Sequence, residues 1–172
     1  SYSEGKRTCE CYCYAYTKEF NVNVTIARLA QTFGPGVFGD DNRVSIQFAK
    51  SALQNKDIVL HTKGESLSNF CYITDAIIGI LVLLKSGVVG EAYNICNSNE
   101  TRSIYDIAKL VADEVVDGHI SVVIDISATN CYGYAPTVKY YLSSDKLQAL
   151  GWKPEINMKD GFQLLIDYLQ QK

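Results

Sequence analysis

The spacing of hydrophobic residues along the chain alternates between a pattern typical of helices and a pattern typical of strands. Good helix formers run from residue 2 to residue 19, and the β-branched stretch VNVTIARL at 22–29 predicts a strand. Further helices are expected at 44–54, 75–85, 104–116, 144–150 and 158–170, and further strands at 58–61, 70–73, 92–96 and 120–126. This alternation predicts an α/β architecture with parallel pairing, in which 22–29 and 92–96 share a sheet.

Polar residues mark where two of these helices begin. Asp75 precedes the most apolar helix, where a carboxylate lies near the positive end of the helix dipole. Ser103 precedes the helix at 104–116, and Asp106 follows in its first turn. We therefore interpret Asp75 as a helix-capping residue rather than a catalyst. We interpret Trp152, in a short Gly-Trp-Lys-Pro stretch, as a packing anchor.

Size and charge exclude several classes of protein. The 172 residues suffice for one compact domain with its own core. A net charge of -3 and a pI near 5.4 argue against a nucleic-acid surface, which needs clustered positive charge. The longest apolar run, at 76–84, is shorter than the ~20 residues that span a bilayer. No signal-peptide pattern is visible, and we expect a cytoplasmic protein without nucleic-acid or membrane partners.

The chain has six cysteines, three of them crowded near the N-terminus. Neither a Cys-x-x-Cys pair nor a Cys/His pair with zinc spacing occurs, so no metal site is expected. On a helix, Cys9 and Cys13 share a face that Cys11 does not. Buried free thiols are the simpler interpretation, and a soft-metal or redox site is the alternative.

Tyr2 and Lys6 form the spacing Tyr-x-x-x-Lys at the start of the first predicted helix. Residues i and i+4 lie on one helix face, so the Lys ammonium can sit beside the Tyr side chain and favour tyrosinate. A phenol tuned in this way can remove or return a hydroxyl proton during hydride transfer. The same spacing arises often by chance, so its meaning depends on the rest of the chain.

Four further stretches follow in order: RLAQTFGP at 28–35, FCYITD at 70–75, YNICNSNE at 93–100 and LGWKP at 150–154. They resemble the Arg-x-x-Asn-x-Tyr-Gly-Pro, Phe-x-Tyr-Val-x-Asp, Tyr-Asn-Ile-Gly and Leu-Gly-Trp-x-Pro signatures of the NAD-dependent epimerase/dehydratase family, which are extended short-chain dehydrogenases. The resemblance covers essentially the whole chain. The residues around Tyr2 most resemble the corresponding stretch of UDP-glucuronate decarboxylases and dTDP-glucose 4,6-dehydratases. UDP-glucose 4-epimerases resemble it almost as well.

The resemblance implies a fold and a set of site residues. The fold is the C-terminal portion of a Rossmann-like extended short-chain dehydrogenase, with 1–36 and 70–102 in the Rossmann-like domain and 37–69 and 103–172 in a small α/β substrate-binding domain. NAD would be the cofactor, a UDP- or dTDP-sugar the substrate, and a homodimer or higher self-association the assembly. Tyr2 and Lys6 would be catalytic, and the substrate-binding candidates are Gln31, Arg43, Val44 and Asn99.

Several departures from the family's pattern bear on these expectations. The N-terminal nucleotide-binding half is missing, so we expect no tight NAD binding by this chain. The turn with Gly34, Gly36 and Gly39 is followed by two aspartates whose carboxylates would repel a pyrophosphate. Gln31, Phe33 and Ser68 stand where the family has Asn, Tyr and a diphosphate-binding Arg. These changes leave a second interpretation open, in which the chain is a non-catalytic binding or interaction module that retains the fold.

Overall fold

The computed structural model describes residues 1–38, 40–126 and 136–171. Its helices are α1 (Tyr2–Phe20), α2 (Val44–Leu53), α3 (Ile73–Ser86), α4 (Ile104–Leu110), α5 (Asp145–Gln148) and α6 (Met158–Gln170), and a π-helical turn η1 (Val111–Val115) continues α4. Its strands are β1 (Ile26–Leu29), β2 (Gln31–Phe33), β3 (Ile58–Leu60), β4 (Leu67–Tyr72), β5 (Ala92–Ile95), β6 (Thr101–Ser103) and β7 (Val122–Ile124). Helices and strands alternate as the sequence predicts.

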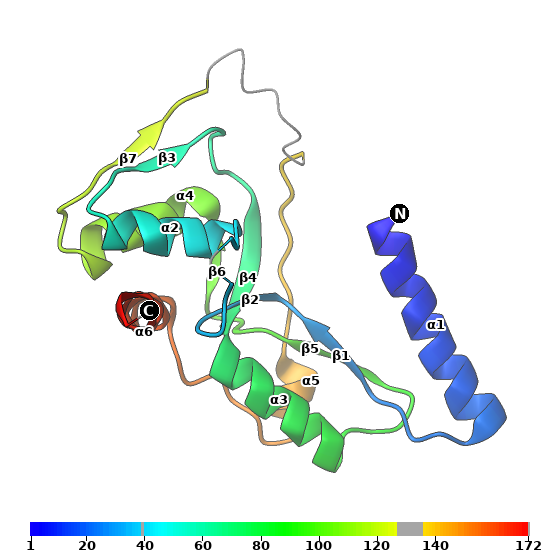
Figure 1. Cartoon of the computed structure of the whole chain (residues 1–172). Coiled ribbons are helices and arrows are strands. Elements are labelled where there is room, and N and C mark those ends of the chain that lie inside the picture. Colours follow the sequence, from blue (N-terminus) through cyan, green and yellow to red (C-terminus); the bar gives the residue numbers. More distant parts are fainter. Residues whose placement is uncertain (39, 127–135, 172) are drawn as a thin grey trace.

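The strands form three small sheets that are mainly parallel. β1 pairs with β5 in parallel, with Ile26 opposite Ala92, which confirms that these two segments share a sheet. β4 lies between β2, to which it is parallel, and β6, to which it is antiparallel. β3 and β7 form a separate parallel pair beside α2 and α4 (Figure 1).

Two hydrophobic clusters hold the body together. The larger one joins β2, β3 and β4 to α2, α4 and α6, and includes the buried rings of Phe33, Phe70 and Phe162. The smaller one joins α3 to β4 and β5 and contains Trp152. The Trp152 side chain is 1% exposed, and this burial confirms that the residue is a packing anchor. The predicted division of the chain into a Rossmann-like domain (1–36 and 70–102) and a substrate-binding domain (37–69 and 103–172) stays a prediction.

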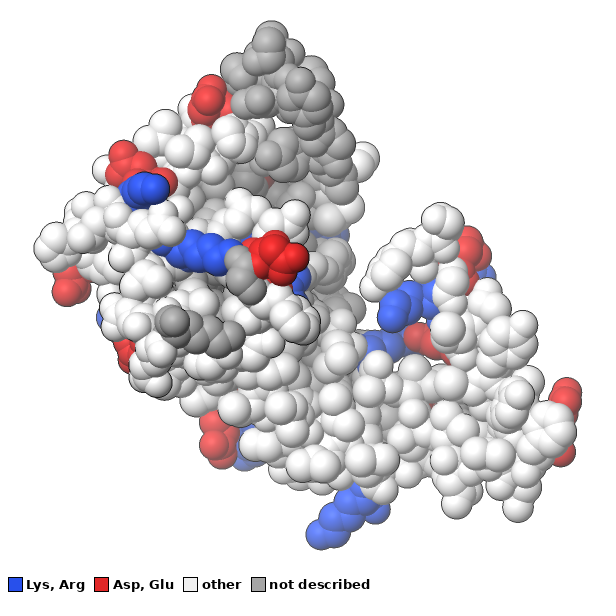
Figure 2. Space-filling model, viewed as in Figure 1, with Lys and Arg blue, Asp and Glu red and all other residues white. Residues whose placement is uncertain are grey.

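Helix α1 stands away from the rest of the molecule (Figure 1). None of its residues is buried, although Tyr12, Tyr14, Tyr16 and Phe20 are all large and partly apolar. The Arg28 guanidinium on β1 donates two hydrogen bonds to the Glu10 carboxylate on α1, at 2.7 and 2.6 Å. Figure 2 shows this separation on the surface, with acidic and basic side chains scattered over the visible face rather than gathered by sign.

Helix α3 is apolar on both of its sides. Its inner side packs on β4 and β5 through Ala76, Gly79 and Leu83. Its outer side exposes Leu81 and Leu84, together with Ile77 and Ile78. In the parts of the chain that the structure describes, no helix is long and apolar enough to cross a membrane.

The main differences from the predicted elements concern short strands and helix ends. The strand expected at 22–29 begins only at Ile26, and β2 and β6, of three residues each, were not predicted. The helix at 104–116 is confirmed as α4 and η1 together, and the Ser103–Asp106 capping box is present. Asp75 lies in the first turn of α3, but its carboxylate accepts from the backbone N–H groups of Glu155 and Ile156 at 3.1 and 3.0 Å.

Candidate active site

A broad groove separates α1 from β1 and has a volume of about 660 Å³. We call it the α1 groove. Its α1 wall includes Tyr2 and Lys6, and its opposite wall is formed by residues 26–32 and Arg43. The Lys6 Nζ lies 5.6 Å from the centre of the Tyr2 ring, so the motif's two side chains share a face as the sequence predicts. Tyr2 is 78% exposed, which leaves its hydroxyl accessible from the groove.

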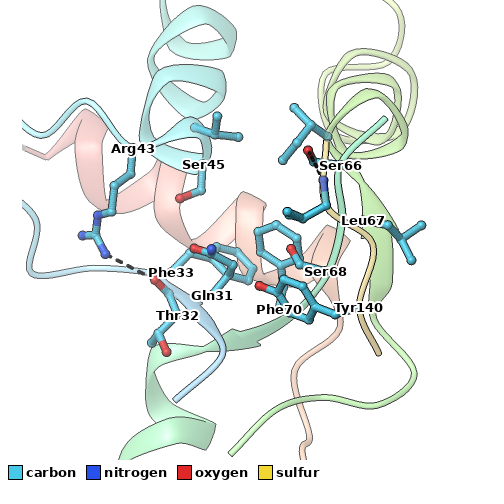
Figure 3. Close-up of a pocket in the computed structure, with 13 residues that line it drawn as sticks. Gln31, Thr32, Phe33, Arg43, Ser45, Ser66, Leu67, Ser68, Phe70 and Tyr140 are labelled. Carbon is cyan, nitrogen blue, oxygen red and sulfur yellow. Dashed lines mark hydrogen bonds between the residues drawn. The ribbon is translucent and has the colours of Figure 1, made fainter. Parts of the chain in front are cut away.

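A second cavity of about 260 Å³ adjoins this groove. We call it the α2 pocket, because it lies between the first turn of α2 and the strands β2 and β4 (Figure 3). Its apolar walls are Phe33, Val44, Leu67, Phe70, Ile104 and Val138, and its polar side chains are Ser45, Ser66, Ser68 and Tyr140. Gln31, Thr32 and Arg43 line both cavities, so the two are neighbours that share one wall.

Arg43 stands at the junction of the two cavities, just before α2 begins. Its Nη2 lies 2.6 Å from the Asp41 carboxylate, and its Nη1 donates to the Thr32 carbonyl at 3.4 Å (Figure 3). Hydrogen bonding to this guanidinium lowers the pKa of the Asp41 carboxyl. The pair therefore stays ionised at neutral pH, and the Asp41 carboxylate balances the charge of the Arg43 guanidinium.

The α2 pocket has the composition of a site for a flat, mostly neutral group. Aromatic and aliphatic walls bury apolar surface, and a few hydroxyls fix the orientation of a bound molecule. One hydroxyl is already engaged, since Ser66 Oγ accepts from the Val138 N–H at 3.3 Å. An anionic group would instead lie toward Arg43, at the end of the pocket that meets the α1 groove.

Comparison with known proteins identifies the family of this chain. Residues 1–96 match the family described as the NAD dependent epimerase/dehydratase family. The chain belongs to this family. UDP-glucuronic acid decarboxylase 1 from Xenopus tropicalis is 32% identical over 171 residues, which are 99% of this chain and 39% of the relative. Human dTDP-D-glucose 4,6-dehydratase is 27% identical over 175 residues, covering 99% of this chain and 48% of the relative.

Solved structures of epimerases and dehydratases share the fold. The UDP-glucose 4-epimerase of Thermotoga maritima superimposes with a TM-score of 0.81 at 20% identity, over 96% of this chain and 52% of that one. The dTDP-glucose 4,6-dehydratase of Bacillus anthracis, solved in complex with NAD, gives 0.79 at 21% identity, over 99% and 52%. The chain thus spans about half the length of these proteins, and less than half of the two curated relatives.

The NAD-dependence of the epimerase/dehydratase family raises the question of which residues here fit that cofactor. Tyr2 and Lys6 suit its ribose and nicotinamide end, because both carry polar groups into an open groove. The pyrophosphate would need backbone N–H groups of a glycine turn at a helix N-terminus. Among the described residues that line the α1 groove there is no glycine, and its Arg28 is bound to Glu10. The described residues therefore fit one end of the cofactor only.

The predicted family site is brought together with one exception. Tyr2, Lys6, Gln31, Arg43 and Val44 all border the two cavities. Asn99 is exposed and lines neither of them, and its backbone N–H donates to the Asn97 side chain at 3.0 Å. The catalytic and substrate-binding roles of all six stay predictions. Within the described ranges, no group of three or more His, Cys, Asp or Glu could hold a metal ion.

Several pocket residues were not singled out from the sequence. Ser66 lines the pocket just before β4, and Phe70 lines it from within that strand. Ser68, between them, was marked in the sequence only as the replacement for the family's Arg. Alternation with period two indicates that the three share a face, and that signal was available in the sequence. Tyr140 gave no such signal, since its position depends on a bridge between Leu67 and Lys139, 72 residues apart.

Proposed function

We propose that this chain carries the Tyr–Lys pair and the substrate pocket of an NAD-dependent nucleotide-sugar epimerase or dehydratase. One observation supports this most strongly. The groove that holds Tyr2 and Lys6 lies next to the α2 pocket, and Gln31, Thr32 and Arg43 border both. A substrate with its nucleoside in the pocket would thus extend its sugar toward the phenol.

In this proposal Tyr2 acts as the acid/base group. Its phenolate takes the proton from a sugar hydroxyl as the carbon beneath is oxidised, and its phenol returns the proton when the carbonyl is reduced. The ammonium of Lys6 stabilises the phenolate from the same helix face. The chemistry that NAD supplies when bound is the reversible acceptance of a hydride. Epimerisation, dehydration and decarboxylation share this first oxidation, so the Tyr–Lys pair does not choose among them.

The pocket residues have binding roles in the same proposal. Val44 and Phe70 offer apolar surface to a base, while Gln31 can hydrogen-bond a sugar or phosphate oxygen. Arg43 is the cation at the junction and would exchange part of its contact with Asp41 for the diphosphate. Relatives named UDP-glucuronic acid decarboxylase and dTDP-D-glucose 4,6-dehydratase support a UDP- or dTDP-sugar as the substrate.

Calorimetry of the 172-residue chain with UDP-glucose, UDP-glucuronic acid and dTDP-glucose tests the binding part. We expect weak binding of at least one sugar, and Arg43→Gln should weaken it about 10- to 100-fold, the worth of a hydrogen bond to a charged group. Arg7→Gln is the matched control, because Arg7 is exposed and lines neither cavity, and it should bind like the parent. Equal losses in the two variants would refute the assignment of the pocket.

A non-catalytic binding module is the second candidate, and the pocket itself favours it in one respect. Ser68 is a wall residue where the family has an Arg, and Arg43 is paired with Asp41. A module of this kind would bind its ligand but would be indifferent to loss of the Tyr2 hydroxyl. The turnover measurement on Tyr2 described in the Discussion separates the two candidates.

A further inference from the structure

The first turn of α2 forms one wall of the α2 pocket. Ile46 and Gln47 donate their backbone N–H groups to the Arg43 carbonyl at 2.9 and 3.0 Å. The N–H groups of Val44 and Ser45 come before them in the helix, and in the described part of the chain they have no acceptor. Both residues line the pocket. Free N–H groups at a helix N-terminus carry partial positive charge, so they favour an anion.

The N-terminus of α2 lacks the side chains that complete other helix ends in this protein. Among the described residues no side chain caps α2, and its first turn has no acidic residue. By contrast, Asn157 accepts from the Asp160 N–H at the start of α6, and Asp75 lies in the first turn of α3. The Asp41 carboxylate accepts from the Arg43 N–H at 3.0 Å and is paired with the Arg43 guanidinium. The N-terminus of α2 is thus available to an acceptor from outside the chain.

Two buried hydroxyls provide an independent indication of a ligand. Ser45 on α2 and Ser68 on β4 are each 7% exposed, and both line the pocket (Figure 3). Neither hydroxyl has a hydrogen-bond partner among the described residues. Buried polar side chains are nearly always hydrogen-bonded, because burial without a partner loses the bonds made to water. These two hydroxyls therefore indicate a polar group that enters the pocket from outside the chain.

The donors on the pocket wall identify the chemistry of that group. Two N–H groups and two hydroxyls can all donate, and the Arg43 guanidinium at the end of the pocket adds positive charge. This set of donors would repel a cation. A phosphate group offers several acceptor oxygens and a negative charge that the helix N-terminus favours. Ser68 stands where the family has a diphosphate-binding Arg, so neutral donors would hold the phosphate in place of that guanidinium.

We propose that the α2 pocket contains a phosphate subsite in which neutral donors replace the family's guanidinium. The N–H groups of Val44 and Ser45 bind phosphate oxygens at the helix end, and the hydroxyls of Ser45 and Ser68 donate from two walls of the pocket. The identity of the phosphate's carrier, the diphosphate of a nucleotide sugar, rests on the proposed function. The subsite itself binds a phosphate group whatever molecule carries it.

Titration of the isotope-labelled chain with inorganic pyrophosphate, followed by the amide chemical shifts in NMR spectra, tests the subsite. The Val44 and Ser45 amide resonances should shift in a saturable way. The Lys159 amide in the first turn of α6 is the internal control, because Asn157 caps that helix, and its resonance should not shift. Equal shifts at the two helix starts, or no shift at Val44 and Ser45, would overturn the proposal.

Alanine variants of the two serines test the hydroxyls in the same titration. Ser45→Ala and Ser68→Ala should each weaken pyrophosphate binding about tenfold, the lower end for a hydrogen bond to a charged group. Ser51→Ala is the matched control, because Ser51 lies on α2 and lines neither cavity, and it should bind like the parent. Parental affinity in either Ser45→Ala or Ser68→Ala would sink the assignment. The titration contains neither NAD nor a sugar, so its outcome is separable from failure of the proposed function.

Discussion

The hydroxyl of Tyr2 is the single group on which the proposed chemistry depends. Tyr2→Phe removes the proton acceptor and keeps the ring, so turnover should fall about 10²–10⁴-fold, the usual contribution of a positioned acid/base. The measurement is steady-state turnover of UDP- and dTDP-sugars by a protein that joins these residues to the family's nucleotide-binding segment. Tyr12→Phe is the control on the same helix, since Tyr12 lines neither cavity. A parental rate in Tyr2→Phe would remove Tyr2 from the mechanism.

Asp75 is a buried carboxylate whose role is to hold the chain after Trp152 in place. It accepts from two backbone N–H groups, and its own carbonyl accepts from Trp152 Nε1 at 3.0 Å. Asp75→Ala would leave those two N–H groups without their acceptor and should lower the free energy of unfolding by about 2–4 kcal/mol. Urea unfolding measures it. Asp75→Asn retains one oxygen and should cost clearly less; equal costs would contradict this role.

At the residue scale, the sequence predicts well what is local. Tyr2 and Lys6 share a face because both belong to one helix, and Ser103 and Asp106 cap α4 from three residues apart. Asp75 was expected to serve its own helix, and its carboxylate instead bonds 80 residues away. No pattern in the sequence encodes that partner, because it depends on how the segment after Trp152 folds back onto α3.

Within α6, Gly161 is required by packing rather than by the helix. An added Cβ would lie 2.8 Å from Phe33 Cζ and 3.0 Å from Tyr72 Cδ2, and both rings are buried. Glycine to alanine in a helix usually gains up to ~1 kcal/mol, yet Gly161→Ala should destabilise by about 1–3 kcal/mol through overpacking. Gly5→Ala in α1 meets nothing within 4 Å and should not destabilise. Thermal unfolding compares the two, and a more stable Gly161→Ala protein would contradict the packing.

Element prediction succeeded where the hydrophobic pattern is long. The apolar helix expected at 75–85 and the last helix, expected at 158–170, are found as α3 and α6. β2 and β6, of three residues each, are too short to show alternation, and each owes its strand geometry to β4 between them. Residues 22–25 have strand-forming side chains but lie before the paired register of β1 and β5, and the Val24 carbonyl accepts from the Gly90 N–H at 2.7 Å.

At the scale of the molecule, the outer side of α3 is an apolar surface without a cover in the described residues. Leu81 and Leu84 are 57% and 76% exposed, and Ile77 and Ile78 lie beside them. Burying such surface is favourable by ~25 cal/mol per Å², so we expect self-association at micromolar concentration. Replacing Leu81 and Leu84 by Lys should shift sedimentation toward monomer, while Leu164→Lys on α6 should not. A clean parental monomer at high micromolar concentration would contradict this.

The 172-residue chain by itself should bind NAD only weakly. The Tyr2–Lys6 end of the α1 groove can hold part of the cofactor, but two such contacts do not offset the several kcal/mol lost on association. Calorimetry with NAD should show a dissociation constant weaker than micromolar. A micromolar or tighter constant would reveal a pyrophosphate site among residues that we have not assigned to it.

Every sheet in this molecule joins segments that are far apart along the chain. Ile26 pairs with Ala92 and Ile58 with Val122, more than sixty residues away in each case. Closing a loop of that size costs entropy before any ladder hydrogen bond forms, and parallel pairing cannot begin from a tight hairpin. The helices can form early from local contacts, whereas β1 must wait for β5 to be synthesised and positioned. During that interval the β1 segment IARL is unpaired, which makes the time between synthesis and sheet closure the period when this chain is most exposed to aggregation.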